Sequence, residues 1–346
     1  MTRREIVIEA LNHRETTPRP YHIDFTDQAL EQLIEYTGDK DIEEKLGTYL
    51  YYKQYWGWPT ELPDRPGYFK DEFGVIWNRN GADKDIGLPD VEDLLIEDLE
   101  DYDYEFPVCD EERLRAEFEE MTRDKVKDDR FIMYGFGFSM FERSWSLMGM
   151  ENILCSMVIC PEETEEFFRK IGDYYCRLVD IALEYDFDGI YFGDDWGQQK
   201  GLIMGREHWR HYIKPQMARL YKKVKDKGLY VLQHSCGDCS ELFEDLIEMG
   251  LDCYQTFQPE IYDIAKIKET YGDKLSFWGG ISTQQCLPFS TPEQVQEEIV
   301  RVYNILNKDG GYIVAPTHAV AFDVSPENIM AMAEVFQNQE KYFGKK

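Results

Sequence analysis

The stretch Val231-Leu-Gln-His-Ser-Cys-Gly-Asp238 joins a short apolar strand to a histidine and a cysteine two residues apart. In an extended strand, residues i and i+2 point to the same face. His234 and Cys236 therefore share a face at the end of one rigid element, as two ligands of a metal such as zinc require. A second apolar strand, Gly311–Thr317, leads into His318. We expect His318 to be the third ligand.

Strands alternate with helices from about residue 131 onwards. The predicted strands are Phe131–Gly135, Asp188–Gly193, Leu229–His234, Cys253–Phe257, Leu275–Trp278 and Tyr312–Ala315. Strands separated by helices of ten or more residues pair in parallel through right-handed crossovers. This pattern leaves two architectures, a closed (β/α)8 barrel and an open doubly wound sheet.

The barrel is favoured because polar side chains follow nearly every strand, and in a barrel these strand ends converge on one mouth. An open sheet gathers its ligands at a single switch point, and the chain lacks a G-x-G-x-x-G fingerprint for a dinucleotide there. We therefore predict an α/β fold, a (β/α)8 TIM barrel. The polar residues are Asp194, Asp195, His234, Cys236, Gln255, Gln258, Ser282, Gln284 and His318.

The first third of the chain is predicted to elaborate this barrel. Pro20–Phe25 is a candidate first strand, and residues 27–129 form an insertion or cap of helices with a hairpin near Tyr68–Trp77. This interpretation leaves one of the eight strands unidentified. No repeat or flexible linker divides the sequence, so we treat residues 1–346 as one domain.

Charge and apolar content exclude several classes of partner. The 346 residues include 68 acidic and 38 basic side chains, a formal charge of -30, which repels nucleic acids and anionic membrane surfaces. Met1–Asn12 predicts an amphipathic helix and not a signal peptide, so we expect a cytoplasmic protein. The eight cysteines are scattered, as expected of reduced thiols. Cys236 and Cys239 form a C-x-x-C, but the second pair of a zinc ribbon is absent.

Several segments together resemble the uroporphyrinogen decarboxylase superfamily. They are His234-Ser-Cys-Gly-Asp238, Phe277–Gln284, Gly310–His318, Ser325–Met330 and, more weakly, Asn12–Arg14 and Pro18–Pro20. The resemblance implies a TIM barrel with one of two chemistries. One is the metal-free decarboxylation of a tetrapyrrole, and the other is zinc-dependent methyl transfer to or from a corrinoid.

The residues favour the methyltransferase branch. Decarboxylases resemble one another in an R-Q-A-G-R segment after the first strand that binds the substrate's carboxylates, whereas this chain has His22-Ile-Asp-Phe-Thr-Asp27, with two acids and no arginine. The methyltransferase branch implies an H-x-C and a distant cysteine as zinc ligands, and the distant cysteine falls at His318. Either this histidine replaces the thiolate, or it matches a histidine of the metal-free decarboxylases. We favour the metal because Cys236 has no other evident task. A uroporphyrinogen III decarboxylase and a metal-free binding barrel remain the alternatives.

The ligand set has a mechanistic consequence. Zinc held by one thiolate and two histidines carries about one more positive charge than zinc held by two thiolates and a histidine, which makes it the stronger Lewis acid. We therefore expect a methyl group to leave an oxygen or nitrogen centre, with a methoxylated aromatic compound as the favoured substrate, while cob(I)alamin attacks the methyl carbon. The sequence contains no D-x-H-x-x-G element for cobalamin, so the corrinoid arrives on a partner protein or free in solution.

Further site residues are predicted from their places after strands. Asp194 and Asp195 are candidate catalytic acids or metal ligands, although one of them capping the following turn is the alternative. Glu142 lies in a similar place after an earlier strand. Phe141 and Trp145 are either an aromatic wall for a flat substrate or core. The predicted substrate or cofactor contacts are His22, Phe141, Trp145, Gln199, Gly280 and Gln284.

Overall fold

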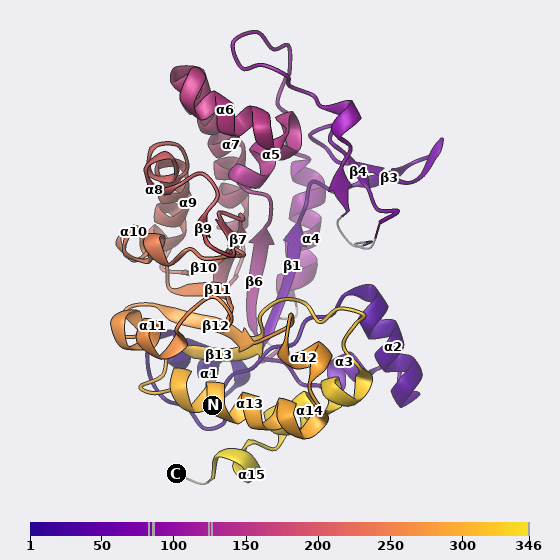
Figure 1. Ribbon diagram of the computed structural model, residues 1–346, viewed down its shortest axis with the longest axis vertical. Helices are drawn as coiled ribbons and strands as arrows, with labels where there is room; N and C mark the ends of the chain where they lie inside the picture. The colour runs from indigo at the N-terminus through magenta and orange to yellow at the C-terminus, as the bar shows by residue number, and fades with distance from the viewer. Residues whose placement is uncertain (82–83, 85–86, 124, 126, 345–346) are drawn as a thin grey trace. The chain divides into compact units, whose positions relative to one another are not determined.

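A computed structural model describes residues 1–81, 84, 87–123, 125 and 127–344, and Figure 1 shows it as a ribbon. Contacts divide the chain into two units. The first unit holds residues 1–51, 125–132 and 251–346, and the second holds 52–124 and 133–250. Each unit contains parallel strands that alternate with helices.

Parallel strands form the centre of the second unit. They are β6 (Phe131–Phe136), which begins in the first unit, β7 (Gly189–Gly193) and β10 (Tyr230–His234). Ile190 pairs with Tyr134 on one side and with Val231 on the other. Every residue of β6 and β7 is buried, as expected of strands covered on both faces. Along the chain, α7 (Pro161–Ala182) lies between β6 and β7, and α9 (Lys214–Asp226) lies between β7 and β10. These two helices pack against each other.

The strand that the sequence leaves unidentified is β1 (Leu50–Tyr55), which lies within the segment assigned to the insertion. It runs beside β6, since Phe131 N donates to Tyr49 O and Gly137 N donates to Tyr55 O. Its sequence, Leu-Tyr-Tyr-Lys-Gln-Tyr, is no apolar run, and four of its six residues are only partly buried. Hydrophobic pattern alone therefore does not reveal it.

The first unit has its own parallel strands, β11 (Cys253–Phe257), β12 (Ser276–Ile281) and β13 (Tyr312–Pro316). Trp278 of β12 pairs with Ile313 of β13. The predicted first strand appears only as two isolated parallel bridges, Tyr21 with Val314 and Phe25 with Val320. Tyr49 N donates to Tyr21 O, which places this segment between β13 and the start of β1.

Helices flank the strands of the first unit. The longest is α13 (Pro292–Leu306), which starts with a capping box between Thr291 and Gln294 and packs against α14 and β12 (Figure 1). The others are α1 (Arg3–Leu11), α2 (Asp27–Thr37), α3 (Ile42–Lys45), α11 (Ile264–Tyr271), α12 (Cys286–Phe289), α14 (Pro326–Gln337) and α15 (Gln339–Phe343).

The second unit adds shorter elements around its strands. The helical ones are η1 (Val91–Asp93), α4 (Glu111–Arg123), α5 (Phe141–Met148), α6 (Met150–Ile159), α8 (Arg206–His208), η2 (Trp209–Ile213), η3 (Ser240–Leu242) and α10 (Phe243–Met249). A small two-stranded ladder joins β8 (Gly197–Gln198) and β9 (Gly201–Leu202). Among the residues that the structure describes, no helix combines the length and the apolar character needed to cross a bilayer.

An antiparallel sheet contains the hairpin predicted near Tyr68–Trp77, which is confirmed. Its strands, in spatial order, are β2 (Thr60–Leu62), β3 (Arg65–Lys70), β4 (Ile76–Asn78) and β5 (Leu88–Pro89). Tyr68 pairs with Asn78 and Lys70 pairs with Ile76.

A buried ion pair attaches this sheet to α5. Arg143 Nη1 donates to Asp71 Oδ2 at 2.7 Å, and both side chains are 0 % exposed. Asp71 also accepts from Val75 N at 2.9 Å and from Trp77 Nε1 at 3.1 Å, while the Arg143 guanidinium lies 3.9 Å from the ring centroid of Phe73. The carboxylate of Asp71 thus links the β3–β4 turn, β4 and α5.

Replacing Asp71 by Ala is expected to lower the free energy of unfolding by about 3 to 5 kcal/mol, because the Arg143 charge is then left buried without its partner. Asp93→Ala is the matched control, since Asp93 pairs with Arg65 in a solvent-exposed contact worth less than about 1 kcal/mol. Denaturant unfolding followed by tryptophan fluorescence measures both. Equal losses for the two variants contradict the prediction.

Candidate active site

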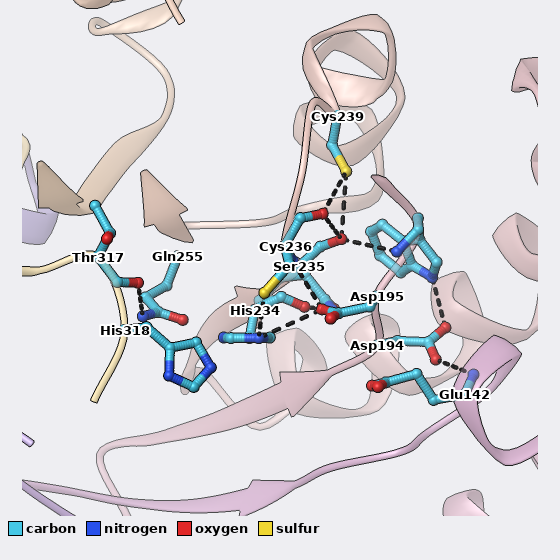
Figure 2. Close-up of polar contacts among 12 residues, drawn as sticks. Glu142, Asp194, Asp195, His234, Ser235, Cys236, Cys239, Gln255, Thr317 and His318 are labelled. Carbon is cyan, nitrogen blue, oxygen red and sulfur yellow. Dashed lines mark hydrogen bonds and ion pairs between the residues drawn. The ribbon is translucent and has the colours of Figure 1, made fainter. Parts of the chain in front are cut away.

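His234 and Cys236 lie together at the carboxyl end of β10 (Figure 2). The Cys236 Sγ is 3.6 Å from His234 Nε2, and both residues are partly exposed. Two ligands at about 2.3 Å and about 2.0 Å from a tetrahedral zinc ion are about 3.5 Å apart. The observed separation therefore fits one edge of a zinc coordination tetrahedron, as the H-x-C spacing predicts.

The carboxylate of Asp195 contacts both members of this pair. Its Oδ1 accepts a hydrogen bond from Cys236 N at 2.7 Å and lies 3.4 Å from His234 Nε2. Burial acts to raise the pKa of Asp195, but hydrogen bonds from His234 and Cys236 hold it below its ordinary value. Burial, followed by the charge of Asp195, raises the pKa of the Cys236 thiol well above its usual range. A divalent cation bound to the sulfur would oppose both of these effects on the Cys236 pKa, because it favours the thiolate.

Asp194 has a different task from its neighbour. Its side chain is fully buried and accepts from three successive backbone amides at the start of α5: Met140 N at 3.2 Å, Phe141 N at 3.0 Å and Glu142 N at 2.9 Å. It also accepts from Trp196 Nε1. Both oxygens are therefore occupied by protein donors. These contacts suit a positioning role, because the buried carboxylate holds a helix N-terminus, and the catalytic role of Asp194 stays a prediction.

Glu142 is the second residue of α5 and extends into the same cluster (Figure 2). Burial, together with the charges of Asp195 and Asp194, raises the pKa of Glu142 well above its ordinary value. A carboxyl group with a raised pKa keeps its proton to higher pH than an ordinary glutamate does, which suits general acid catalysis. The structure thus groups Glu142 and Asp195 with the histidine and cysteine of β10.

The predicted aromatic wall is only partly exposed. Phe141 is fully buried and belongs to the core, whereas Trp145 is partly exposed and lies with its ring 5.8 Å from Phe138. Trp77 and Trp56 complete the cluster, at 4.9 and 5.5 Å from Phe138. Phe138 is not among the predicted site residues; it lies just after β6 and has a positive φ of 51°.

Two glycines that are not among the predicted site residues shape the loop that carries Cys236. A Cβ on Gly197 would lie 2.6 Å from Cys236 O, and one on Gly237 would lie 2.2 Å from the Gly197 carbonyl carbon. The two backbones cross so closely that only glycine fits at both positions. The glycine directly after H-S-C was the signal for this crossing. Gln199 lies in the nearby β8–β9 turn, where it is exposed.

In the first unit, His318 is exposed and follows β13. Its Nδ1 accepts from Ala319 N at 2.9 Å. A neutral imidazole has one acceptor nitrogen, so metal ligation by His318 would replace this hydrogen bond. Beside it, Gln255 Nε2 donates to Thr317 O at 3.2 Å (Figure 2).

The remaining candidates of the first unit differ in exposure. His22 is buried, with its Nε2 2.8 Å from Asp24 Oδ1 and its ring 5.6 Å from Trp278. Gln284 is exposed in the turn after β12. Gly280 has a φ of 90°, and a Cβ there would lie 2.6 Å from Tyr312 Oη. Packing within the first unit therefore accounts for this glycine without a ligand.

Comparison with known proteins identifies the family. The profile of the uroporphyrinogen decarboxylase (URO-D) family matches residues 82–339, well over half of the chain. The chain belongs to this family. A solved structure described as a methyltransferase from Methanosarcina mazei superposes on 98 % of this chain and 99 % of its own length, with a TM-score of 0.72 and 16 % identity. That agreement confirms the predicted barrel fold.

Curated relatives in the URO-D family include more than one activity. A methylated-thiol–coenzyme M methyltransferase of Methanosarcina mazei is 23 % identical over 188 residues, which are 54 % of this chain and 47 % of that protein. A uroporphyrinogen decarboxylase of Ruthia magnifica is 19 % identical over 182 residues, which are 52 % of this chain and 51 % of that protein. The chain spans about half the length of the curated relatives it matches.

Asp194→Asn is expected to lower the free energy of unfolding by about 2 kcal/mol, because an amide nitrogen then faces backbone and indole donors that lose their acceptor. Asp195→Asn is the comparison, since one amide oxygen still serves the Cys236 amide. Chemical denaturation of both variants tests this. A smaller loss for Asp194→Asn than for Asp195→Asn would show that the anchoring of α5 is of little consequence.

Proposed function

We propose that this protein is a zinc-dependent methyltransferase in which His234, Cys236 and His318 hold the metal. The observation that supports this most is the 3.6 Å separation of Cys236 Sγ and His234 Nε2, which suits zinc. His318 follows a barrel strand as His234 does, and ends of barrel strands are where sites of this fold assemble. Asp195 is the proposed support of the pair, because it accepts from the Cys236 amide beside His234.

Methyl transfer is favoured over decarboxylation by the residues themselves. An octa-anionic porphyrinogen requires cations at the pocket entrance, but the segment from His22 to Asp27 supplies two acids and no arginine. Its histidine lies 2.8 Å from one of those acids, Asp24. The similarity to a methylated-thiol–coenzyme M methyltransferase points in the same direction.

The proposed substrate is a small methylated compound, with a methoxylated aromatic compound favoured. Bound zinc supplies a Lewis acid that takes up charge on the departing oxygen. Glu142 donates the proton that this oxygen needs, since its raised pKa lets the carboxyl group keep its proton to higher pH than an ordinary glutamate does. Trp145, three residues after this acid on α5, is partly exposed and offers aromatic surface for a flat ring. The methyl group passes to a reduced corrinoid carried by a partner protein.

Purified protein is expected to contain about one zinc ion per chain. Cys236→Ala and His318→Ala each remove a ligand, so each is expected to weaken zinc binding by at least about a hundredfold. Cys239→Ala is the matched control, because this buried thiol lies 3.3 Å from Ser235 Oγ and has no place in the ligand set. Competition with a chelator followed by metal analysis measures the affinities.

The Cys236→Ala and His318→Ala variants test the two parts of the proposed zinc site separately. Undiminished zinc affinity in His318→Ala removes that residue from the site and leaves the pair on β10. Undiminished affinity in Cys236→Ala, or a loss in Cys239→Ala as large as that in Cys236→Ala, contradicts the site as a whole.

Zinc-loaded protein is expected to transfer methyl groups to cob(I)alamin from a methoxybenzoate faster than from a methyl thioether or a methylamine. Glu142→Gln is expected to slow the transfer from oxygen by about a hundredfold, because the leaving oxygen loses its general acid. Methylated corrinoid is followed by its absorbance. Transfer from the thioether alone would replace the oxygen substrate by a sulfur one, and release of carbon dioxide from uroporphyrinogen III without methyl transfer would favour the decarboxylase.

A further inference from the structure

A cavity lies in the first unit, beside the segment that leads into Tyr21. Its volume is about 1040 Å³. The chain from Thr17 to Tyr21 forms one wall, and the end of α14 together with α15 forms another. The candidate active site draws on none of these residues, so the cavity has no role in the function proposed above.

Arg19 lines this cavity, and among the described residues none forms a hydrogen bond or an ion pair with its guanidinium. The residue is only 7 % exposed, and its hydrogen bonds to Gln339 involve its backbone N and O alone. Its Nε is buried, and among the described residues no acceptor lies within hydrogen-bond distance of it. The guanidinium carbon lies 4.5 Å from the ring centroid of Tyr303 and 5.1 Å from that of Phe343. The aromatic rings stabilise the cation but satisfy none of its N–H groups.

Two acids, Glu334 and Glu340, line the cavity together with Lys341. Glu334 accepts from Lys341 Nζ at 2.9 Å and from Asn338 Nδ2 at 2.7 Å. Burial lowers the pKa of Arg19, and the charge of Glu15 acts in the opposite direction through space. An arginine nevertheless stays charged in proteins. Among the described residues, the charge of this cavity-lining arginine therefore has no contacting carboxylate, which is costly unless a ligand supplies one.

We propose that this cavity binds a small organic oxyanion whose carboxylate or phosphate contacts Arg19. A planar guanidinium presents parallel N–H groups that match two oxygens of such a ligand. Tyr21, Tyr49 and Phe336 are also lining residues of the cavity, and all three are buried. The ring centroids of Tyr49 and Phe336 lie 5.0 and 5.2 Å from that of Tyr21. An aromatic carboxylate matches this combination of cation and rings better than bare phosphate does.

Benzoate and inorganic phosphate are the two probes. Titration of the full chain, followed by saturation-transfer NMR for benzoate and by the shift of the thermal midpoint for both, gives their affinities. We expect benzoate to bind more tightly than phosphate and Arg19→Gln to weaken benzoate at least tenfold. Arg14→Gln is the matched control, because Arg14 pairs with Glu9 on the exposed surface and does not line the cavity.

A second variant keeps the test decisive if Arg19→Gln fails to fold. Asn338→Trp places a large ring at an exposed position of the cavity wall, leaves Arg19 intact and is expected to weaken benzoate as well. Tighter binding of phosphate than of benzoate would keep the oxyanion site and remove the aromatic preference. The proposal is overturned if wild type binds neither probe at about 10 mM, or if Arg14→Gln and a folded Arg19 variant lose binding equally.

Discussion

The arrangement of the second unit's site depends on one buried carboxylate, that of Asp194. It gathers the first amides of α5 and the indole of Trp196, and so fixes where the helix begins. Its own amide donates to His234 O, and the amide of Trp196 donates to Ser235 Oγ. The ends of β7 and β10 and the start of α5 therefore form one connected network. Glu142 supplies one of those amides, so its position depends on the same carboxylate.

Three neighbouring acids in this network are stabilised in three different ways. Burial raises the pKa of Asp194 to about 6, although backbone amides at a helix N-terminus and the Trp196 indole act in the opposite direction. Hydrogen bonds from His234 and the Cys236 amide hold the pKa of Asp195 below its ordinary value. A backbone hydrogen bond from Asp195 supports Glu142, but burial beside two carboxylates raises its pKa well above the ordinary value. Groups whose surroundings push their pKa values apart are suited to different chemical roles, and the proposed proton donor and the acid beside the proposed ligands differ in this way.

Sequence reasoning predicted what local pattern determines and missed what tertiary contacts determine. The apolar runs of β7 and β10 and the i, i+2 spacing of His234 and Cys236 are local, and the structure confirms them. In contrast, β1 contains Lys53 and Gln54, whose environment depends on what packs beside them. The separate tasks of the two adjacent aspartates were equally invisible, since they depend on which donors α5 brings to Asp194. Alternation along the strand could distinguish their faces but not their partners.

The elaborated N-terminal part is joined to the site through consecutive residues of α5. Successive side chains of a helix point about 100° apart. Phe141 therefore enters the core, Glu142 faces the acids, and Arg143 reaches Asp71 in the antiparallel sheet. Since Asp71 also binds Trp77, whose ring lies against Phe138, the sheet positions part of the aromatic cluster beside Trp145. The short helix α5 thus connects the antiparallel sheet to Glu142, the proposed proton donor. Changes in that sheet can therefore alter the aromatic surface without moving the proposed ligands on β10.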